Sequence, residues 1–389
     1  MTDPASFDPS AVDLDAFMRD LSALRQEIDA SLGEEDLEHL KKIEWWGRSC
    51  TALGLLGAGL APNPISAALL GLGRSTRWML MHHMFHRAYD KVPGVPERYK
   101  SKVFARGRRR YVDFLDWILP EAWAYEHMTH HAYVNEPRDP SRAECVFDEF
   151  RDQPLWVQYF MHGVAAVGWR PLKFAPASLV MWLERHEPKE SRVVLQRQLL
   201  PYVLDVLRTS YAPHVAVHFV GMPLCYLPLG PWGVMSAFCN SVMADIFMSL
   251  QLYLVFMPSH TGEDMYRWEG RPRSRAESTL RQIVGTVNYP ADGDLSSFLQ
   301  VWLNYHIEHH LFPDVPLRTY TWIRPRVQEI CARHGIPYVE ESAFVRFLKM
   351  VDVTVHGGPI KRERASESRA KPPVAEKDRP VEIPVSAAV

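Results

Sequence analysis

The sequence predicts an all-α integral membrane protein with four transmembrane helices, arranged as two hairpins, and a cytoplasmic helical cap that holds a metal site. Two long stretches of the 389-residue chain, residues 49–73 and 209–244, contain no Lys, Arg, Asp or Glu. Histidines recur at helical spacing in three clusters. Basic residues gather beside these clusters, whereas the turns at 61–64 and 228–233 are uncharged. The positive-inside rule therefore places every histidine cluster on the cytoplasmic side.

Residues 1–42 are expected to form an acidic, amphipathic cytosolic segment. Apolar residues recur at helical spacing from Leu14 to Ile28. We interpret this pattern as a helix packed on the cap, and the alternative is a docking site for a basic electron carrier. The segment lacks the basic n-region and apolar core of a cleavable signal peptide, so membrane insertion is expected to depend on the internal spans.

The membrane domain is expected to cover residues 43–350, with spans near 45–61, 64–84, 213–230 and 233–257. Arg48, Arg74 and Arg77 leave the first two arms short of the about 20 apolar residues that a full span needs. Snorkelling or a locally thinned bilayer would accommodate them. Asp245 lies inside the last span and therefore needs a polar partner or a cavity.

The other parts of the chain are expected to lie outside the bilayer core. Residues 154–208 mix apolar, aromatic and charged groups, which favours interfacial helices such as 156–169. Residues 317–350 are typical of soluble helices, and residues 351–389 of a disordered tail. Both termini are expected in the cytoplasm, with the multi-pass chain in the inner membrane if the cell is bacterial. No basic tract indicates nucleic acid binding.

The histidine clusters have the spacing of metal ligands. Rings at i, i+3 and i+4 project from one face of a helix, and imidazole suits iron, copper, zinc and nickel. One ion would be oversupplied by these rings, whereas two would be well served, and two irons beside apolar helices would suit oxygen activation next to an apolar substrate. The absence of Glu-x-x-His pairs argues against a ferritin-like site, and that of His-Glu-x-x-His against a zinc protease. The candidate ligands are His82, His86, His127, His130, His131, His260, His306, His309 and His310.

The order and spacing of the clusters resemble the membrane fatty acid desaturase superfamily. The motifs are His82-x3-His86, His127-x2-His130-His131 and His306-x2-His309-His310, with spans between the second and the third. The words around them also match: Glu126-His127-Met128-Thr129-His130-His131-Ala132-Tyr133-Val134-Asn135 before Asp139-Pro140, and His309-His310-Leu311-Phe312-Pro313. The likeness covers roughly residues 45–345.

The resemblance implies a four-helix stem and a cytoplasmic cap with a histidine-ligated diiron site. It implies two non-haem iron ions as cofactors and O2 as co-substrate. Members use two external electrons to introduce a cis double bond into an acyl chain, with water as the other product. The eight motif histidines carry over as ligands by position, and His260 occupies the place after the fourth span where members often have a further ligand.

The resemblance also implies partners. The substrate is expected to be an acyl lipid or acyl thioester in the lipid bilayer. His306 stands where members with a fused cytochrome b5 domain typically have Gln. The electrons are therefore expected from a separate ferredoxin, rubredoxin or cytochrome b5 type donor with its reductase. The alternatives are a diiron hydroxylase or ketolase acting on an alkyl or isoprenoid lipid, and a non-catalytic membrane protein that binds a metal or a partner.

Other polar residues near the motifs receive supporting roles. Metal-bound imidazoles usually donate their second N–H to an acceptor. His83 points about 100° away from His82 on a helix and is not expected to be a ligand. His214 and His218 lie outside the motif positions, and an interfacial or headgroup role is expected for them. The candidate acceptors are Asp90, Glu126, Asn135, Asp139, Asp264, Asn304 and Glu308, of which Asn304 could instead hold a water on iron.

Overall fold

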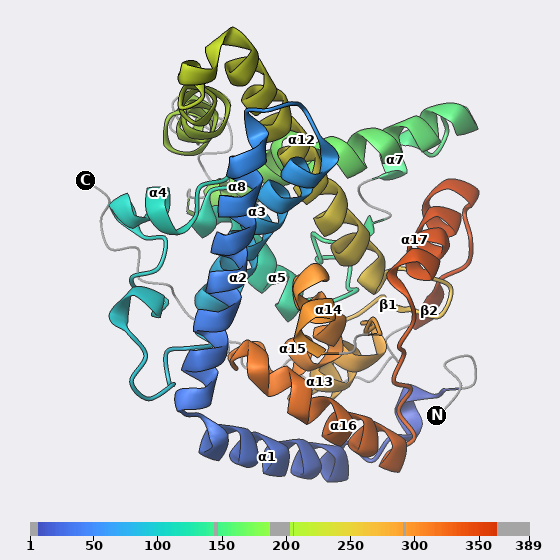
Figure 1. The fold of residues 1–389 in the computed structure, drawn as a ribbon. Helices are drawn as coiled ribbons and strands as arrows, with labels where there is room; N and C mark the ends of the chain where they lie inside the picture. The colour runs from blue at the N-terminus through green and yellow to red at the C-terminus, as the bar shows by residue number, and fades with distance from the viewer. Residues whose placement is uncertain (1–6, 144–146, 187–202, 205, 291–292, 364–389) are drawn as a thin grey trace.

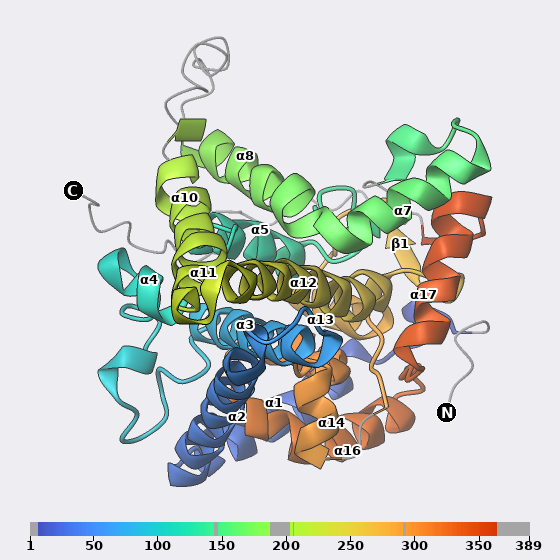
Figure 2. The same cartoon turned by 45° about the horizontal axis from the view of Figure 1, so that its top comes forward.

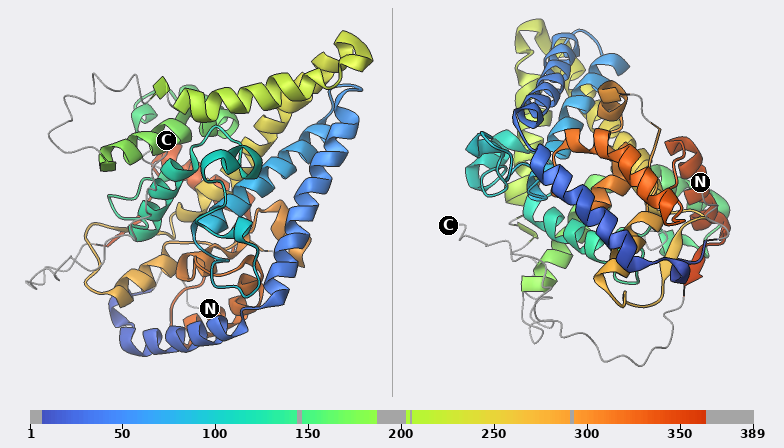
Figure 3. Two further views of the ribbon diagram at one scale, coloured as in Figure 1. Left: turned by 90° about the vertical axis from the view of Figure 1, so that its left-hand side faces the viewer. Right: turned by 90° about the horizontal axis from the view of Figure 1, so that it is seen from below.

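A computed structural model describes residues 7–143, 147–186, 203–204, 206–290 and 293–363. The long helices α2 (Glu34–Ala58), α3 (Pro64–Phe85) and α12 (Gly230–Phe256) extend together towards one end of the molecule (Figure 1). Shorter helices gather at the other end, as the side view also shows (Figure 3). The described chain is therefore an elongated helical stem joined to a helical cap.

The first hairpin is formed by α2 and α3, which pack against each other. Asn63 caps α3 by accepting a 2.7 Å hydrogen bond from the Ser66 amide, and Pro64 occupies the first helical position. The two helices lie so close together that a Cβ atom at Gly47 would come within 2.6 Å of the Thr76 side chain. Glycine permits this approach because it has no side chain. The turn between the helices lies where the sequence predicts it.

The second hairpin has an irregular first arm. Residues 207–224 form successive helical segments, η8 (Leu207–Tyr211), α10 (Ala212–Val215), η9 (Ala216–Gly221) and α11 (Met222–Leu224). Two of these segments are π-helical. The chain then turns into α12 at Gly230, whose φ of 75° favours glycine. Helix α12 lies between α3 and the α7–α8 region (Figure 2).

Among the described helices, Leu227–His260 is the one that is long and apolar enough to cross a membrane. Helix α3 has the length of a span but carries Arg74 and Arg77, and α2 carries Glu44 and Arg48. The helices and turns agree with two hairpins, and the four-span topology stays a prediction. Residue 42 falls within the continuous helix α2, so the expected boundary between residues 42 and 43 does not coincide with a break in the chain.

Two helices cross the stem near the C-terminal end of α12. They are α7 (Leu155–Trp169) and α8 (Ala175–His186), joined by the π-helical turn η6 (Arg170–Phe174). Trp156 and Phe160 on α7 are exposed. An exposed aromatic face is typical of a helix at a membrane interface, which stays the prediction for this segment.

The cap is built from the C-terminal helices and the N-terminal helix α1 (Leu14–Ser31). The buried face of α1, including Phe17 and Leu21, packs on α16 (Leu317–Arg333), so the apolar stripe predicted for this segment faces the cap (Figure 3). Arg25 also pairs with Asp314 at 2.8 Å. The other cap helices are α5 (Pro120–Ala132), η11 (Met257–His260), α13 (Arg275–Val284), α14 (Gly293–Leu299), η12 (Leu303–Tyr305), α15 (His306–Leu311) and α17 (Ala343–Val351).

The structure differs from the predicted all-α chain with a disordered tail from residue 351. Residues 352–356 form the π-helical turn η13 (Asp352–His356). Strand β2 (Lys361–Glu363) pairs in parallel with β1 (Tyr266–Trp268). Strand β1 provides backbone hydrogen-bond partners for residues 361–363, which the composition of the tail does not reveal. Residues 364–389 of the predicted tail lie outside the described residues. The remaining short elements are η2 (Pro9–Ala11), η3 (Glu97–Tyr99), η4 (Gly107–Arg109), α4 (Arg110–Asp113), η5 (Asp148–Phe150) and η10 (Leu227–Leu229).

Candidate metal centre

Four separate segments carry the candidate ligands to one place in the cap. The last turn of α3 contributes His82 and its C-cap residue His86. Helix α5 contributes the second cluster, η11 contributes His260, and α15 contributes the third cluster. Eight of the nine rings are buried, and His131 is partly buried. The nine rings form two neighbouring groups.

The first group brings together five imidazoles from three helices. Their ligand atoms all lie within 4.8 Å of one another. The Nε2 atom of His82 is 3.0 Å from Nε2 of His309 and 3.0 Å from Nε2 of His127. Such convergence of Nε2 atoms is the arrangement that a shared metal ion requires. The members are His82, His86, His127, His131 and His309.

The second group combines His130, His260 and His310, whose ligand atoms also lie within 4.8 Å of one another. Nε2 of His130 is 3.2 Å from Nε2 of His260. His306 lies beside this group, with its ring centroid 4.8 Å from that of His260 and 4.9 Å from that of His310. Four rings are therefore available to a second ion.

Hydrogen bonds at Nδ1 turn several Nε2 atoms towards these groups. His130 Nδ1 lies 2.8 Å from a carboxylate oxygen of Asp139, one of the predicted acceptors. His260 Nδ1 donates to the Gly285 carbonyl at 2.8 Å, and His310 Nδ1 donates to Gln282 Oε1 at 2.8 Å. An acceptor at Nδ1 keeps the proton there and leaves the Nε2 lone pair free for a metal.

Three of these acceptors were not predicted. Gln282 and Gly285 lie on and after α13, and the hydroxyl of Tyr320, 3.2 Å from His309 Nδ1, lies on α16. None is adjacent in sequence to the ring that it contacts, and no local motif marks it. Their role depends on how the cap helices pack against each other.

The other predicted acceptors bind elsewhere among the described residues. Asn135 acts indirectly, because its backbone amide donates to Asp139 at 2.7 Å and its side chain donates to the Gly285 carbonyl at 3.0 Å. The remaining five contact no motif imidazole through a described hydrogen bond. Asp90 and Glu126 accept from Ser101 and Ser141, Asp264 pairs with Arg346, Asn304 donates to Ser297, and Glu308 accepts from Asn288 and Tyr338.

Burial keeps most of these rings neutral, whereas the pKa of buried His130 is raised above its ordinary value by the Asp139 carboxylate. Burial holds the pKa of His306 well below its ordinary value. Burial, and then the neighbouring imidazoles, hold the pKa of His310 well below its ordinary value. The buried Nε2 atoms of His86, His306 and His310 have no described hydrogen-bond partner. Neutral rings with orphaned, converging nitrogens fit a pair of metal ions.

The histidines that the sequence placed outside the metal site also lie outside both groups. His83 Nδ1 bonds to the Met79 carbonyl at 3.0 Å. His214 is fully buried, with Nε2 3.5 Å from Asp245 Oδ1, and its ring lies beside that of His218. The interfacial role expected for His214 is therefore replaced by a contact inside the protein, because the aspartate on α12 needs polar neighbours.

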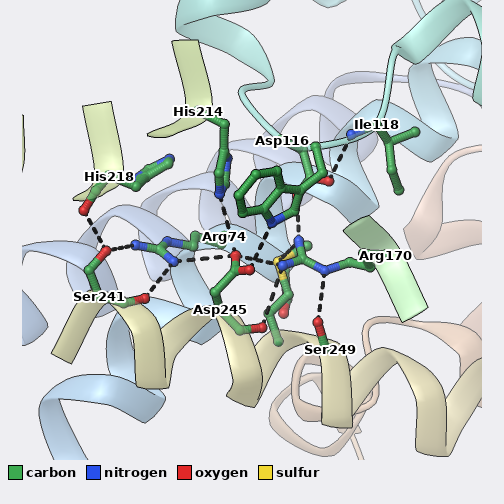
Figure 4. Close-up of polar contacts among 12 residues, drawn as sticks. Arg74, Asp116, Ile118, Arg170, His214, His218, Ser241, Asp245 and Ser249 are labelled. Atoms are coloured by element: carbon green, nitrogen blue, oxygen red, sulfur yellow. Dashed lines mark hydrogen bonds and ion pairs between the residues drawn. The ribbon is translucent and has the colours of Figure 1, made fainter. Parts of the chain in front are cut away.

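Asp245 has the polar partners that its position demands (Figure 4). Arg170 donates to Asp245 Oδ1 at 2.6 Å and also pairs with Asp116. The Trp117 indole donates to Asp245 Oδ2 at 2.8 Å, and Arg74 lies 3.5 Å from Oδ1. This buried network joins α3, α12, the turn after α7 and the loop before α5, all of which carry or adjoin the histidine segments.

We expect Gln282→Leu to weaken iron retention by about 10- to 100-fold, as is typical when a residue that orients a metal-bound imidazole is lost. Leucine offers no acceptor to His310 Nδ1 and no donor to the His131 carbonyl, which Gln282 Nε2 contacts at 2.9 Å. The measurement is iron per chain after dialysis against increasing chelator.

Gln158→Leu is the matched control for this substitution. Gln158 is also buried and also donates to backbone carbonyls, those of Arg151 and Gln153, but it lies on α7. The control variant is expected to retain iron like the unmodified protein. Equal loss from both variants would show that Gln282 has no specific orienting role.

Comparisons with known proteins agree with this geometry. The family model described as fatty acid desaturase matches residues 59–342. Human fatty acid desaturase 3 is 24% identical over 311 residues, 79% of this chain and 64% of that protein. NADPH-dependent stearoyl-CoA 9-desaturase from Mycobacterium tuberculosis is 24% identical over 353 residues, 87% of this chain and 78% of that protein. Delta(5) fatty acid desaturase A from Dictyostelium discoideum is 23% identical over 273 residues, 67% of this chain and 55% of that protein. The chain spans less than two thirds of the length of the human and Dictyostelium relatives.

Proposed function

We propose that this chain, which belongs to the fatty acid desaturase family, catalyses the O2-dependent desaturation of a fatty acyl chain. The observation that carries the proposal is the convergence of nine histidines from four segments into two neighbouring groups. The first group would hold one iron ion, and the second group with His306 would hold the other. Iron, when bound, supplies the oxidising chemistry with O2 that unactivated C–H bonds require.

The protein's own contribution is to position the acyl chain and to exclude water. Trp123 stacks on His127 with ring centroids 4.6 Å apart, and Trp78 contacts both Trp123 and His82. Phe256 lies 6.3 Å from the His127 and His306 rings. These buried aromatic side chains form an apolar wall beside both groups. Such a wall favours a hydrocarbon substrate and holds its carbons near the rings.

The expected substrates and partners follow from the family. The Mycobacterium tuberculosis relative is named for stearoyl-CoA and NADPH, which supports an acyl lipid or acyl thioester as substrate. We propose that electrons reach the site from a separate ferredoxin, rubredoxin or cytochrome b5 type donor and its reductase. We also propose that the stem spans the bilayer as two hairpins and that the cap with its iron site faces the cytoplasm.

Turnover under isotopically labelled O2 tests the proposed reaction. The purified chain with an acyl lipid or acyl thioester, a donor and its reductase is expected to yield a product two hydrogens lighter and without labelled oxygen. Mass spectrometry with double-bond localisation reads the outcome. Labelled oxygen retained in the organic product would instead identify a hydroxylase or ketolase.

A further inference from the structure

A small cationic cavity lies between α2, α3, α4 and the loop that precedes α4. Its volume is about 70 Å³. Figure 1 shows α4 and this loop beside the first hairpin. The cavity is lined by Glu44, Arg48, Arg77, Arg98, Tyr99, Phe104, Arg109, Val112 and Asp113.

The lining carries an excess of positive charge. Four arginines face two carboxylates, Glu44 and Asp113. Burial would raise the pKa of Glu44, but the Tyr99 hydroxyl and three guanidinium groups hold it below its ordinary value, so Glu44 is ionised. The lining therefore holds two more arginines than carboxylates, which favours an anionic ligand.

The arginines also have donors to spare. Arg48, Arg77 and Arg98 each reach Glu44 through one terminal nitrogen, at 2.8, 3.2 and 3.4 Å. A guanidinium has five N–H donors, and its fork matches the oxygen atoms of a phosphate. The three side chains are between 31% and 55% exposed, so a ligand can reach them from outside.

The position of the cavity indicates where such a phosphate would come from. The charge-free stretch 49–73 begins directly after Arg48, and Arg77 lies one turn beyond its other end. On α4, Tyr111 and Val112 are exposed beside the cavity. Arginines at the end of an apolar hairpin, next to exposed apolar side chains, are typical of the headgroup level of a bilayer.

We propose that this cavity binds the phosphate group of an anionic membrane phospholipid. The inference rests on the proposed membrane location of the hairpin but not on the proposed reaction. It is therefore tested by binding alone, without turnover.

The test titrates the full chain in detergent with dioctanoyl phosphatidylglycerol and follows the shift in thermal midpoint. Arg48→Gln/Arg77→Gln is expected to bind this lipid about tenfold more weakly, because it removes two charge-assisted donors. The control variant Lys102→Gln/Arg108→Gln also removes two positive charges. Both residues are exposed, precede α4 and do not line the cavity. This control is expected to change binding by less than about twofold.

Glu44→Gln is expected to have the opposite effect on lipid binding. It frees three arginines from their internal carboxylate and is expected to bind the lipid several-fold more tightly. Circular dichroism of each variant without lipid establishes whether it is folded. Because this variant gains affinity, the result does not depend on a loss that misfolding could mimic.

Several outcomes would overturn the proposal. Equal weakening in the cavity variant and the exposed control would mean that only overall charge matters. Inorganic phosphate that binds as tightly as the lipid would show an anion cavity without preference for a phospholipid. Unchanged lipid affinity in Arg48→Gln/Arg77→Gln would show that these two arginines do not bind the phospholipid.

Discussion

Replacing His309 by Ala is expected to lower the iron content of the purified protein below the proposed two ions per chain and to abolish product formation. His309 lies at the centre of the first group, with Nε2 3.0 Å from His82 and 3.1 Å from His131. Alanine removes one of the five ligand nitrogens of this group. The loss in iron affinity should therefore exceed the roughly 10- to 100-fold that is typical of residues that only orient a ligand. Elemental analysis and product mass spectrometry measure the two effects.

His83→Ala is the matched control for His309→Ala. His83 is also buried, and its ring centroid lies 5.6 Å from that of His309, but it bonds to the Met79 carbonyl and belongs to neither group. This variant is expected to keep both iron ions. If His309→Ala also keeps both ions while folded, the proposed ligand set is wrong.

Arg170→Met is expected to destabilise the protein by about 3–5 kcal/mol, the range found when one partner of a buried ion pair is removed. Arg170 is fully buried and bonds to Asp116, Asp245 and the Ser249 hydroxyl (Figure 4). Methionine would fill similar space but would leave Asp116 without its cation. The measurement is the free energy of unfolding in mixed micelles.

Two further variants separate this effect from general sensitivity to charge. Arg151→Gln breaks an exposed pair with Asp148 and should cost less than about 1 kcal/mol. Adding Asp116→Asn to Arg170→Met should recover part of the lost stability, because the buried charge disappears with its partner. If Arg170→Met is as stable as the unmodified chain, the network in Figure 4 does not hold the stem together.

Much of the architecture was predictable because charge and periodicity are local properties. The uncharged runs and the prolines near residues 61–64 located the helices and turn of the first hairpin, and the histidine spacing predicted the family that the family model confirms. The nine candidate ligands gather as expected in two groups, although their binding of iron stays a prediction.

The residues that orient the ligands were less predictable because they depend on packing. Asp139 lies nine residues from His130 in the same segment and was recognised. Gln282 and Tyr320 reach their histidines from other helices, so spacing along the chain carries no signal for them. The strand at residues 361–363 was missed for a similar reason, since its partner lies almost a hundred residues earlier.

The conformation and contacts of Asn135 limit which residues can replace it and its neighbour Gly285. Its φ of 60° is a conformation that asparagine adopts more readily than most residues. Its backbone supports the carboxylate beneath one imidazole, and its side chain contacts the carbonyl beneath another. Gly285 has no room for a larger residue either, because a Cβ atom there would lie 2.8 Å from the Asn135 amide nitrogen. Asn135 and Gly285 are therefore expected to tolerate few substitutions, although neither has a side chain that contacts an imidazole nitrogen.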